Sequence, residues 1–324
     1  MVDRKYNILV TGVGAIIGYG IIKSLRSSGI SANIVGMDIY DDAVGQAWCD
    51  KFIQAKYAKD PLYLDFLKGI IDEHQIDLVF FGTEQEIYRV GLSGDEFKGY
   101  RNKFVLNKKE LLILSQDKWK TYQFLLEHGG TQFAIPSRIE GEYDELAKKF
   151  GVPFMLKPRS SYASKGINVV KNKEEFDFYK VRMRGNFMAQ PVIGDSEHEY
   201  TVGVFGLGDG TYSGMIAMRR KLSQEGATAK AEVVLDTKLE NTVQALVSVF
   251  KPNGPTNLQF RYHEGRYLLL EINPRISSST SMRMALGYNE AEMCIRYYLE
   301  SQIMVPQISK GKAIRYIDEV VVIS

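Results

Sequence analysis

The chain has 324 residues, of which 45% are hydrophobic and 25% are charged, an ordinary composition for a globular protein. Its net charge of +2, from 41 basic and 39 acidic residues, argues against the positive field that nucleic-acid and anionic-membrane binding require. No apolar run approaches the ~20 residues that span a bilayer, and the first residues lack a signal-peptide pattern. We therefore expect a cytoplasmic protein that binds neither nucleic acid nor membrane.

Strand and helix patterns alternate along the first hundred residues. Compact apolar runs at 6–12, 33–38 and 76–82 predict strands, and the segments 15–28 and 63–74 have helical spacing. The run IDLVFFG is apolar throughout, as expected for a strand covered on both faces. This alternation, with short glycine-marked turns, predicts a Rossmann-like parallel sheet flanked by helices.

A glycine-rich segment, TGVGAIIGYG, follows the first predicted strand. Gly12, Gly14 and Gly18 resemble a dinucleotide-binding fingerprint, although the last gap is one residue too long, and Asp38 ends the next strand where an acid can bind ribose. One interpretation is therefore an NAD(P)-dependent oxidoreductase. The alternative is that the glycines only allow close packing of helix on strand and leave a polar pocket.

The pattern changes after residues 107–120, where one or two helices precede a series of short strands typical of an α+β unit. We predict a first domain at 1–112, a small lobe at 113–190, and a large lobe with the C-terminal tail at 191–324. No long linker separates these parts, so we expect them to pack closely around a cleft that binds a small molecule.

Polar side chains gather in the predicted hairpin around the turn signal HEGR. If residues 264–266 form a three-residue loop, Gln259 lies opposite Glu271, and Asn273 shares their face of the sheet. A two-residue loop would instead place Gln259 opposite Leu270 and scatter the polar groups.

Carboxylate and amide oxygens on one face suit Mg²⁺, which takes few protein ligands and completes its shell with phosphate and water. Arg275, just beyond the strand, is placed to hold phosphate oxygens with its planar guanidinium. For any one of these residues alone, a solvated strand end with a Glu–Arg pair is the better explanation, and it is the four together on one face that favour a site.

The sequence EINPR at 271–275, with NLQF upstream, resembles the signature of the ATP-grasp superfamily, and within it carbamoyl-phosphate-synthetase large subunits and small stand-alone ligases. The resemblance covers roughly residues 115–300 and implies a two-lobed ATP-grasp domain preceded by an accessory Rossmann-like domain. It implies ATP as the nucleotide, Gln259, Glu271 and Asn273 as ligands of Mg²⁺ or Mn²⁺, and Arg275 as a phosphate contact.

The same resemblance assigns further nucleotide contacts. It implies Lys118 and Lys157 as the two cations at the phosphates, and RSSYASKG as the loop that closes over them. This loop is poorer in glycine than related loops, and it offers Ser160, Ser161, Ser164 and Gly166. The segment MAQPVIGDSEHEYTV corresponds to the hinge, which implies adenosine contacts from Gln190, Val192, Glu197 and Glu199; an exposed turn is the alternative for its acidic part.

The remaining candidates concern the substrate and the transfer step. Residues 219–221 are three adjacent cations, and in a strand Arg219 and Lys221 share one face. They could neutralise the transferred phosphate or a substrate carboxylate, or they could form a solvated sheet edge. Glu84 and Glu86 follow a strand of the first domain and could hold a substrate ammonium, with Gly14 beside them, although acids are also favourable at a helix N-terminus.

Together these features predict an ATP-dependent carboxylate–amine ligase that acts through an acyl phosphate and releases ADP. Lys157, Arg219 and Arg275 would offset charge during phosphoryl transfer to a small carboxylate, for example an amino acid, before an amine attacks. Two alternatives stay open, a MgATP-binding regulator without turnover and the NAD(P) enzyme. A homodimer is compatible with this prediction.

Overall fold

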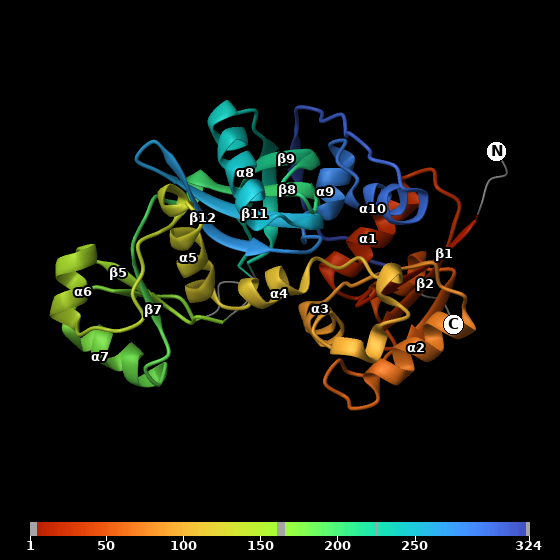
Figure 1. The fold of residues 1–324 in the computed structure, drawn as a ribbon, viewed down its shortest axis with the longest axis horizontal. Coiled ribbons are helices and arrows are strands. Elements are labelled where there is room, and N and C mark those ends of the chain that lie inside the picture. The colour runs from red at the N-terminus through yellow and green to blue at the C-terminus, as the bar shows by residue number, and fades with distance from the viewer. Residues whose placement is uncertain (1–4, 161–165, 225, 322–324) are drawn as a thin grey trace.

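The structure is a computed structural model that describes residues 5–160, 166–224 and 226–321, and it contains a parallel sheet and two antiparallel sheets (Figure 1). The first sheet is parallel throughout, with strand order β3-β2-β1-β4, as predicted. Its strands and helices are β1 (Tyr6–Thr11), α1 (Ile16–Arg26), β2 (Ala32–Asp38), β3 (Lys51–Gln54), α2 (Tyr63–Glu73), β4 (Leu78–Phe80) and α3 (Glu84–Gly91).

Helices cover both faces of this sheet. Along β1, Ile8 and Val10 pack with α1, whereas Leu9 packs on the opposite side with α2. A strand buried on both faces needs apolar side chains at every position, which explains the unbroken apolar run that revealed it in the sequence.

A six-stranded antiparallel sheet forms the largest part of the molecule, with order β12-β11-β8-β9-β10-β13. Its strands are β8 (Glu199–Leu207), β9 (Tyr212–Leu222), β10 (Thr228–Val233), β11 (Asn253–His263), β12 (Arg266–Asn273) and β13 (Lys312–Ile314). Helix α8 (Thr237–Phe250) packs on one face. Helices α9 (Thr280–Ala285) and α10 (Glu290–Glu300) pack between the other face and α1, so the first domain and this sheet share one hydrophobic core.

The small lobe lies at the far end of the molecule from the parallel sheet (Figure 1). Its sheet has the order β6-β5-β7, and its core includes Phe154 and Phe176. Its elements are α6 (Tyr143–Phe150), β5 (Phe154–Lys157), β6 (Asn168–Val170), α7 (Lys173–Arg182) and β7 (Met188–Pro191). Helices α4 (Lys109–Ser115) and α5 (Lys118–Glu127) connect it to the first domain.

The β11–β12 hairpin corrects one prediction. Its loop has two residues, since His263 pairs with Arg266, and both Glu264 and Gly265 have positive φ angles (46° and 75°), as a type I′ turn requires. The predicted three-residue loop is therefore wrong.

The predicted pairing of Gln259 with Glu271 is nevertheless confirmed. A β-bulge shifts the register between Gln259 and Phe260, which pairs with Leu269, so that Leu270 has no partner on β11. The extra residue of the bulge compensates for the shorter loop, and Gln259, Glu271 and Asn273 keep one register.

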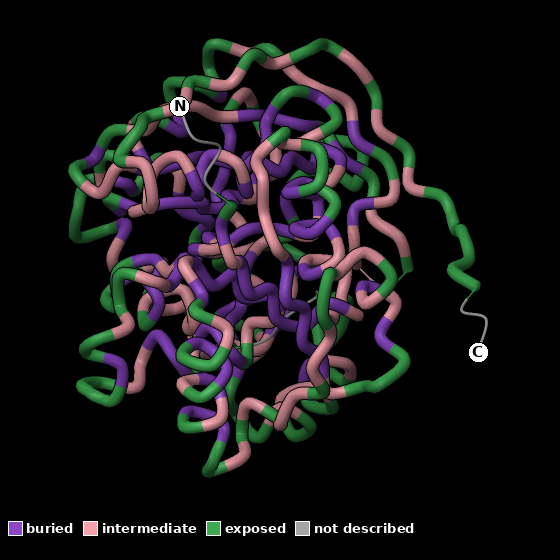
Figure 2. Tube along the Cα trace, turned by 90° about the vertical axis from the view of Figure 1, so that its right-hand side faces the viewer, coloured by how far each residue is buried: buried purple, intermediate pink, exposed green. Residues whose placement is uncertain are grey.

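Burial differs between the regular elements and the C-terminal segment of the chain (Figure 2). The strands and packed helices are largely buried, whereas the segment 301–321 runs over the surface and is mostly exposed, with Ile317 almost fully so. Among the described residues, none of the helices is both long enough and apolar enough to cross a membrane.

Candidate functional site

A cavity of about 420 Å³ lies where the small lobe, the large sheet and the first domain meet. Residues from α3, α5, β7 and β12 line it. Its polar side chains include Lys118, Glu84, Glu271, Asn273 and Arg275, and also Tyr88, Gln116, Thr121 and Gln190. Its apolar side chains form a second group, which includes Leu125, Ala134, Ile135, Met188, Leu269 and Ile272.

Two lysines dominate the electrostatics of the polar group. Lys157, the last residue of β5, is only 6% exposed, and the pKa of its ammonium group is lowered to about 7. Burial is the largest cause of this shift, the positive charge of Lys118 adds to it, and the Glu271 carboxylate opposes both effects without outweighing them. A polyanion between these lysines would restore the charged form of Lys157.

The start of α5 fixes the position of Lys118. Asp117 caps the helix by accepting from the Trp119 N–H (2.9 Å), and its other carboxylate oxygen accepts from Arg159 (2.5 Å). The Lys118 N–H donates to the Arg159 carbonyl (3.0 Å). Helix α5 is thereby tied to the chain that leaves β5, which explains why two lysines far apart in sequence interact.

Glu271, Asn273 and Arg275 stand at the end of β12. The Asn273 amide donates to Glu271 Oε1 (3.0 Å). Arg275 Nε donates to Glu84 Oε1 (3.0 Å), and the two residues also form an ion pair. The predicted phosphate contact and one predicted substrate residue, from opposite ends of the chain, thus meet in this cavity.

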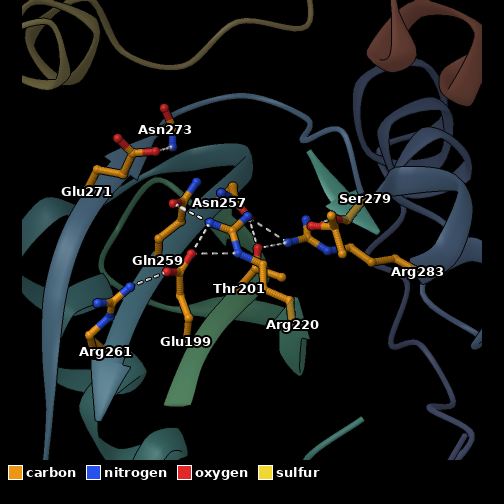
Figure 3. Close-up of polar contacts among 11 residues, drawn as sticks. Glu199, Thr201, Arg220, Asn257, Gln259, Arg261, Glu271, Asn273, Ser279 and Arg283 are labelled. Carbon is orange, nitrogen blue, oxygen red and sulfur yellow. Dashed lines mark hydrogen bonds and ion pairs between the residues drawn. The ribbon is translucent and has the colours of Figure 1, made fainter. Parts of the chain in front are cut away.

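Gln259 has a different partner from the one expected. Its Oε1 accepts from Arg220 (2.6 Å), which also donates to Glu199 (2.8 and 3.1 Å), and Glu199 in turn accepts from Arg261 (2.6 Å). Figure 3 shows this row beside the Glu271–Asn273 pair. The carbonyl oxygen of Gln259 is therefore engaged by Arg220, and Glu199 is a buried member of an ion-pair row.

The donor set fits a magnesium ion that is held mainly by phosphate. Among the described residues, no group of three or more His, Cys, Asp or Glu side chains could hold a metal ion. Glu271 and Asn273 supply adjacent oxygen donors, which matches the one or two protein ligands that Mg²⁺ takes beside substrate phosphates.

Several predicted residues lie elsewhere. Arg219 and Lys221 are exposed and pair with Glu232 and Glu197, at 3.1 and 2.8 Å. Neither Val192, which is exposed, nor Glu197 lines the cavity. In the loop 159–166, Ser160 lines the cavity and Gly166 lines a separate hollow, while Ser161 and Ser164 fall outside the described residues.

A larger cavity, of about 900 Å³, lies at the carboxyl edge of the parallel sheet and is lined by Gly14, Asp38 and Glu86. Asp38 accepts from the Gly14 N–H (2.8 Å), so the protein's own carboxylate occupies the donor that a dinucleotide phosphate would use. A Cβ on Gly18 would lie 2.1 Å from the Gly12 carbonyl oxygen, which shows that this glycine is needed for packing.

Glu86 is a buried structural carboxylate. Thr11 (2.5 Å), Thr83 (2.7 Å) and Tyr63 (2.8 Å) donate to it. Burial raises its pKa, the three hydroxyl groups oppose this shift, and the charge of Asp38 adds to it. The predicted substrate group is thus divided, with Glu84 in the smaller cavity and both Gly14 and Glu86 in the larger one.

Sequence reasoning chose the wrong face of β9. Arg220 is buried, while Arg219 and Lys221 are exposed. Counting in steps of two from the apolar pair Ile216 and Met218 would have pointed Arg220 inward. Asp117, immediately before the lysine of α5, was readable as a helix cap, but its ion pair with Arg159 has no signal in the sequence.

Part of the chain matches a known family, and more of it resembles curated proteins at low identity. Residues 186–320 match the family described as ATP-grasp in the biosynthetic pathway with Ter operon. The carbamoyl phosphate synthase large chain of Methanoregula boonei is 22% identical over 357 aligned residues, which cover 94% of this chain and 33% of that protein. The chain spans at most about a third of the length of the curated relatives considered.

Solved structures share the fold at low identity. N5-carboxyaminoimidazole synthetase from Staphylococcus aureus, complexed with ADP, superposes with a TM-score of 0.70 at 16% identity, covering 97% of this chain and 82% of that one. L-amino acid ligase from Bacillus licheniformis gives a TM-score of 0.67 at 13% identity, covering 94% and 75%. The predicted fold class is confirmed.

Proposed function

Because the chain belongs to the ATP-grasp superfamily, we propose that its cavity between the lobes binds MgATP and that the protein is an ADP-forming carboxylate–amine ligase. One observation carries the proposal. Burial, and then the charge of Lys118, lower the pKa of Lys157. Lys118 lines the cavity together with the oxygen donors of Glu271 and Asn273, and another part of the same cavity is apolar, with Leu125, Ile135 and Met188. A nucleotide has the matching parts, a flat base and a charged triphosphate.

The chain's own residues have distinct tasks in this reaction. Lys118, Lys157 and Arg275 hold the phosphate oxygens and offset charge as the γ-phosphoryl group passes to a carboxylate. Glu271 and Asn273 would hold magnesium, which when bound would neutralise negative charge on the phosphates. No nucleophilic side chain is required, because this transfer depends on positioning and electrostatics.

We infer that the carboxylate accepts the phosphoryl group as an acyl phosphate, which an amine then attacks to form an amide and release phosphate. Glu84 lies in the same cavity and is the candidate to hold the amine as an ammonium ion. An amino acid or another small carboxylate is the substrate class that fits; L-amino acid ligase and carbamoyl phosphate synthase are among the proteins that share its fold or sequence.

The test is to incubate the protein with MgATP and pooled amino acids and small carboxylic acids, and to separate ADP from AMP by chromatography. We expect substrate-dependent ADP, lost in Glu271→Gln and retained in Glu264→Gln, a matched change in the exposed hairpin turn. AMP as the product would overturn the acyl-phosphate step. MgATP binding without turnover in every pool would favour the alternative, a nucleotide-binding regulator. The low glycine content of the loop 159–166 is consistent with that alternative.

A further inference from the structure

The large antiparallel sheet has an open edge at β13. This strand is the last in the order β12-β11-β8-β9-β10-β13, and within the described residues only β10 pairs with it. Just after β13, the Arg315 N–H donates to the Ala229 carbonyl (2.8 Å) and so faces the sheet. Backbone direction alternates along an antiparallel strand, so the N–H and C=O groups of Ile314, and by continuation those of Tyr316, point away from the sheet. An edge of this kind can pair with a further strand.

The chain continues from this edge into an exposed segment with many apolar residues. Residues 314–321, the C-terminal arm, read IRYIDEVV, in which β-branched and aromatic residues predominate. Ile314, Tyr316 and Ile317 are 64%, 77% and 95% exposed, and Figure 2 shows this end of the chain running clear of the body. Single exposed apolar residues are common, but several in a row beside an open sheet edge are typical of a protein interface.

The charges of the C-terminal arm match an antiparallel copy of the same arm. Its cation, Arg315, lies in the first half, and its anions, Asp318 and Glu319, lie in the second. Arg315 donates to the Ser278 carbonyl (2.8 Å), a neutral acceptor that does not cancel its charge. Two arms related by a twofold axis run antiparallel and bring the cation of each toward the anions of the other, whereas parallel arms bring like charges together. The occupant that fits this edge is therefore a second copy of the chain.

Backbone geometry restricts the registers that two such arms can take. Residues whose backbone groups point outward must oppose each other, so the twofold axis passes through a residue and never between two residues. An axis at Arg315 or at Asp318 would place identical charges face to face. An axis at Tyr316 would place Ile314 opposite Asp318. The remaining position within this part of the arm is residue 317.

We propose that the chain forms a twofold dimer in which each C-terminal arm adds a strand to the partner's large sheet, with Ile317 on the axis. In this register Arg315 lies opposite the partner's Glu319, and Ile314 lies opposite the partner's Val320, so charge meets opposite charge and apolar meets apolar. The arm does not line the cavity between the lobes, so the inference is independent of the proposed function. One pair of short strands buries less than the ~1,600 Å² of a standard interface, and we therefore expect a reversible dimer at micromolar concentrations.

Sedimentation velocity of the full chain over a range of concentrations tests the dimer. We expect the wild type to shift from monomer to dimer as its concentration rises. Ile317→Asp places two like charges on the axis and should raise the dissociation constant by roughly tenfold or more. Val305→Asp is the matched control, because Val305 is also exposed (72%) but lies outside the arm.

Two results would overturn the proposal. A wild-type chain that stays monomeric at every concentration would leave this edge to a different protein. A dimer that Ile317→Asp does not weaken would form through another surface.

A charge reversal tests the register. Arg315→Glu alone places acid opposite acid at two points and should weaken the dimer by roughly tenfold. The double variant Arg315→Glu with Glu319→Arg restores opposite charges, and its dissociation constant should return close to the wild-type value. A double variant that is folded, as judged by circular dichroism, but dimerises no better than Arg315→Glu would overturn this pairing.

A disulfide at the axis tests the geometry. Opposed residues of a non-hydrogen-bonded antiparallel pair have Cα atoms ~4.5 Å apart, a separation that a disulfide spans. Under mild oxidation by oxidised glutathione, Ile317→Cys should therefore give a covalent dimer on a non-reducing gel. Val305→Cys, and the wild type with its own Cys49 and Cys294, should stay largely monomeric on that gel. Equal cross-linking of all three chains would overturn the position of the axis.

Discussion

Two regions of this molecule have the outline of a phosphate site, and they differ in how their charges are balanced. At the glycine-rich turn after β1, the N–H group of Gly14 donates to Asp38, and Glu86 has three hydroxyl donors. Beside the cavity between the lobes, burial together with the positive charge of Lys118 lowers the pKa of Lys157 to about 7. In the first region the polar groups pair with one another, whereas the second keeps a buried lysine with a lowered pKa.

For recognising a ligand site, a sequence motif is therefore less informative than the partners that its polar groups have in the folded chain. The last glycine of the apparent dinucleotide fingerprint serves packing, because a Cβ on Gly18 would lie 2.1 Å from the Gly12 carbonyl oxygen. The lysines, by contrast, belong to no local motif and are brought together by folding. The candidate ligand site is recognised here by a buried lysine with a lowered pKa beside a polar cavity.

The largest effect is expected for Lys157→Met. Removing a cation at the phosphates should weaken MgATP binding by roughly a hundredfold or more, since charge-assisted hydrogen bonds to phosphate are strong. Without nucleotide, the free energy of unfolding of the variant should be about 1–3 kcal/mol higher than that of the wild type, because a buried charge with little compensation has been removed. Calorimetry and denaturant unfolding measure the two quantities.

The exposed Lys149→Met on α6 is the matched control and should change neither quantity. A Lys157→Met chain that binds MgATP like wild type would show that Lys157 takes no part in nucleotide binding.

Proton uptake provides the second test. With a pKa of about 7, Lys157 is mostly neutral at pH 8 in the free protein, and a bound triphosphate raises its pKa. Binding at pH 8 should therefore take up close to one proton, seen as a dependence of the calorimetric enthalpy on the ionisation enthalpy of the buffer. The dependence should disappear in Lys157→Met; its persistence there would assign the proton to another group.

The same shift has a consequence for stability. Between pH 7 and the ordinary lysine pKa of 10.5, the unfolded chain binds a proton that folded Lys157 does not. The contribution of Lys157 to the free energy of unfolding should therefore rise with pH over this window. Comparing wild type with Lys157→Met at each pH isolates this contribution, and parallel pH profiles would contradict it.

A smaller effect is expected for Glu84→Gln. The carboxylate pairs with Arg275 and also places a negative charge beside the proposed triphosphate. Its neutralisation should tighten MgATP binding roughly threefold to tenfold. If Glu84 also holds the amine substrate, the KM for the amine should rise in the same variant. Weaker MgATP binding would show instead that Glu84 is needed to position Arg275.

The smallest effect on binding is expected for Asp38→Ala. Removing the acceptor of the Gly14 and Tyr40 N–H groups should cost about 1–3 kcal/mol of stability, but the affinity for MgATP should stay within about twofold of wild type. Loss of nucleotide binding in a chain that remains folded would place the nucleotide at the glycine-rich turn.

The sequence predicted the parallel sheet well, because strands buried on both faces are apolar throughout and helices between them keep a 3.6-residue period. It failed for β3, which is short and has exposed residues at both ends. The pairing of Gln259 with Glu271 was predicted through a wrong loop, and only the bulge at Leu270 makes it right. A bulge leaves no simple signature in a single sequence.

The candidate site was predicted in part. The order of residues placed Glu271, Asn273 and Arg275 at one strand end, but it could not show that Arg220 engages Gln259 or that Glu84 pairs with Arg275. Arg220 and Gln259 lie on different strands, 39 residues apart in the sequence, and Glu84 and Arg275 are 191 residues apart. The inward orientation of Arg220 on β9 could have been predicted, because the apolar residues Ile216 and Met218 alternate in step with it.

A crystal structure of the protein with magnesium and a non-hydrolysable ATP analogue tests the central claim most directly. The account predicts the triphosphate between Lys118 and Lys157, the metal at Glu271 and Asn273, and the base beside Gln190. A nucleotide bound over Gly14 and Asp38 at the carboxyl edge of the parallel sheet would contradict it.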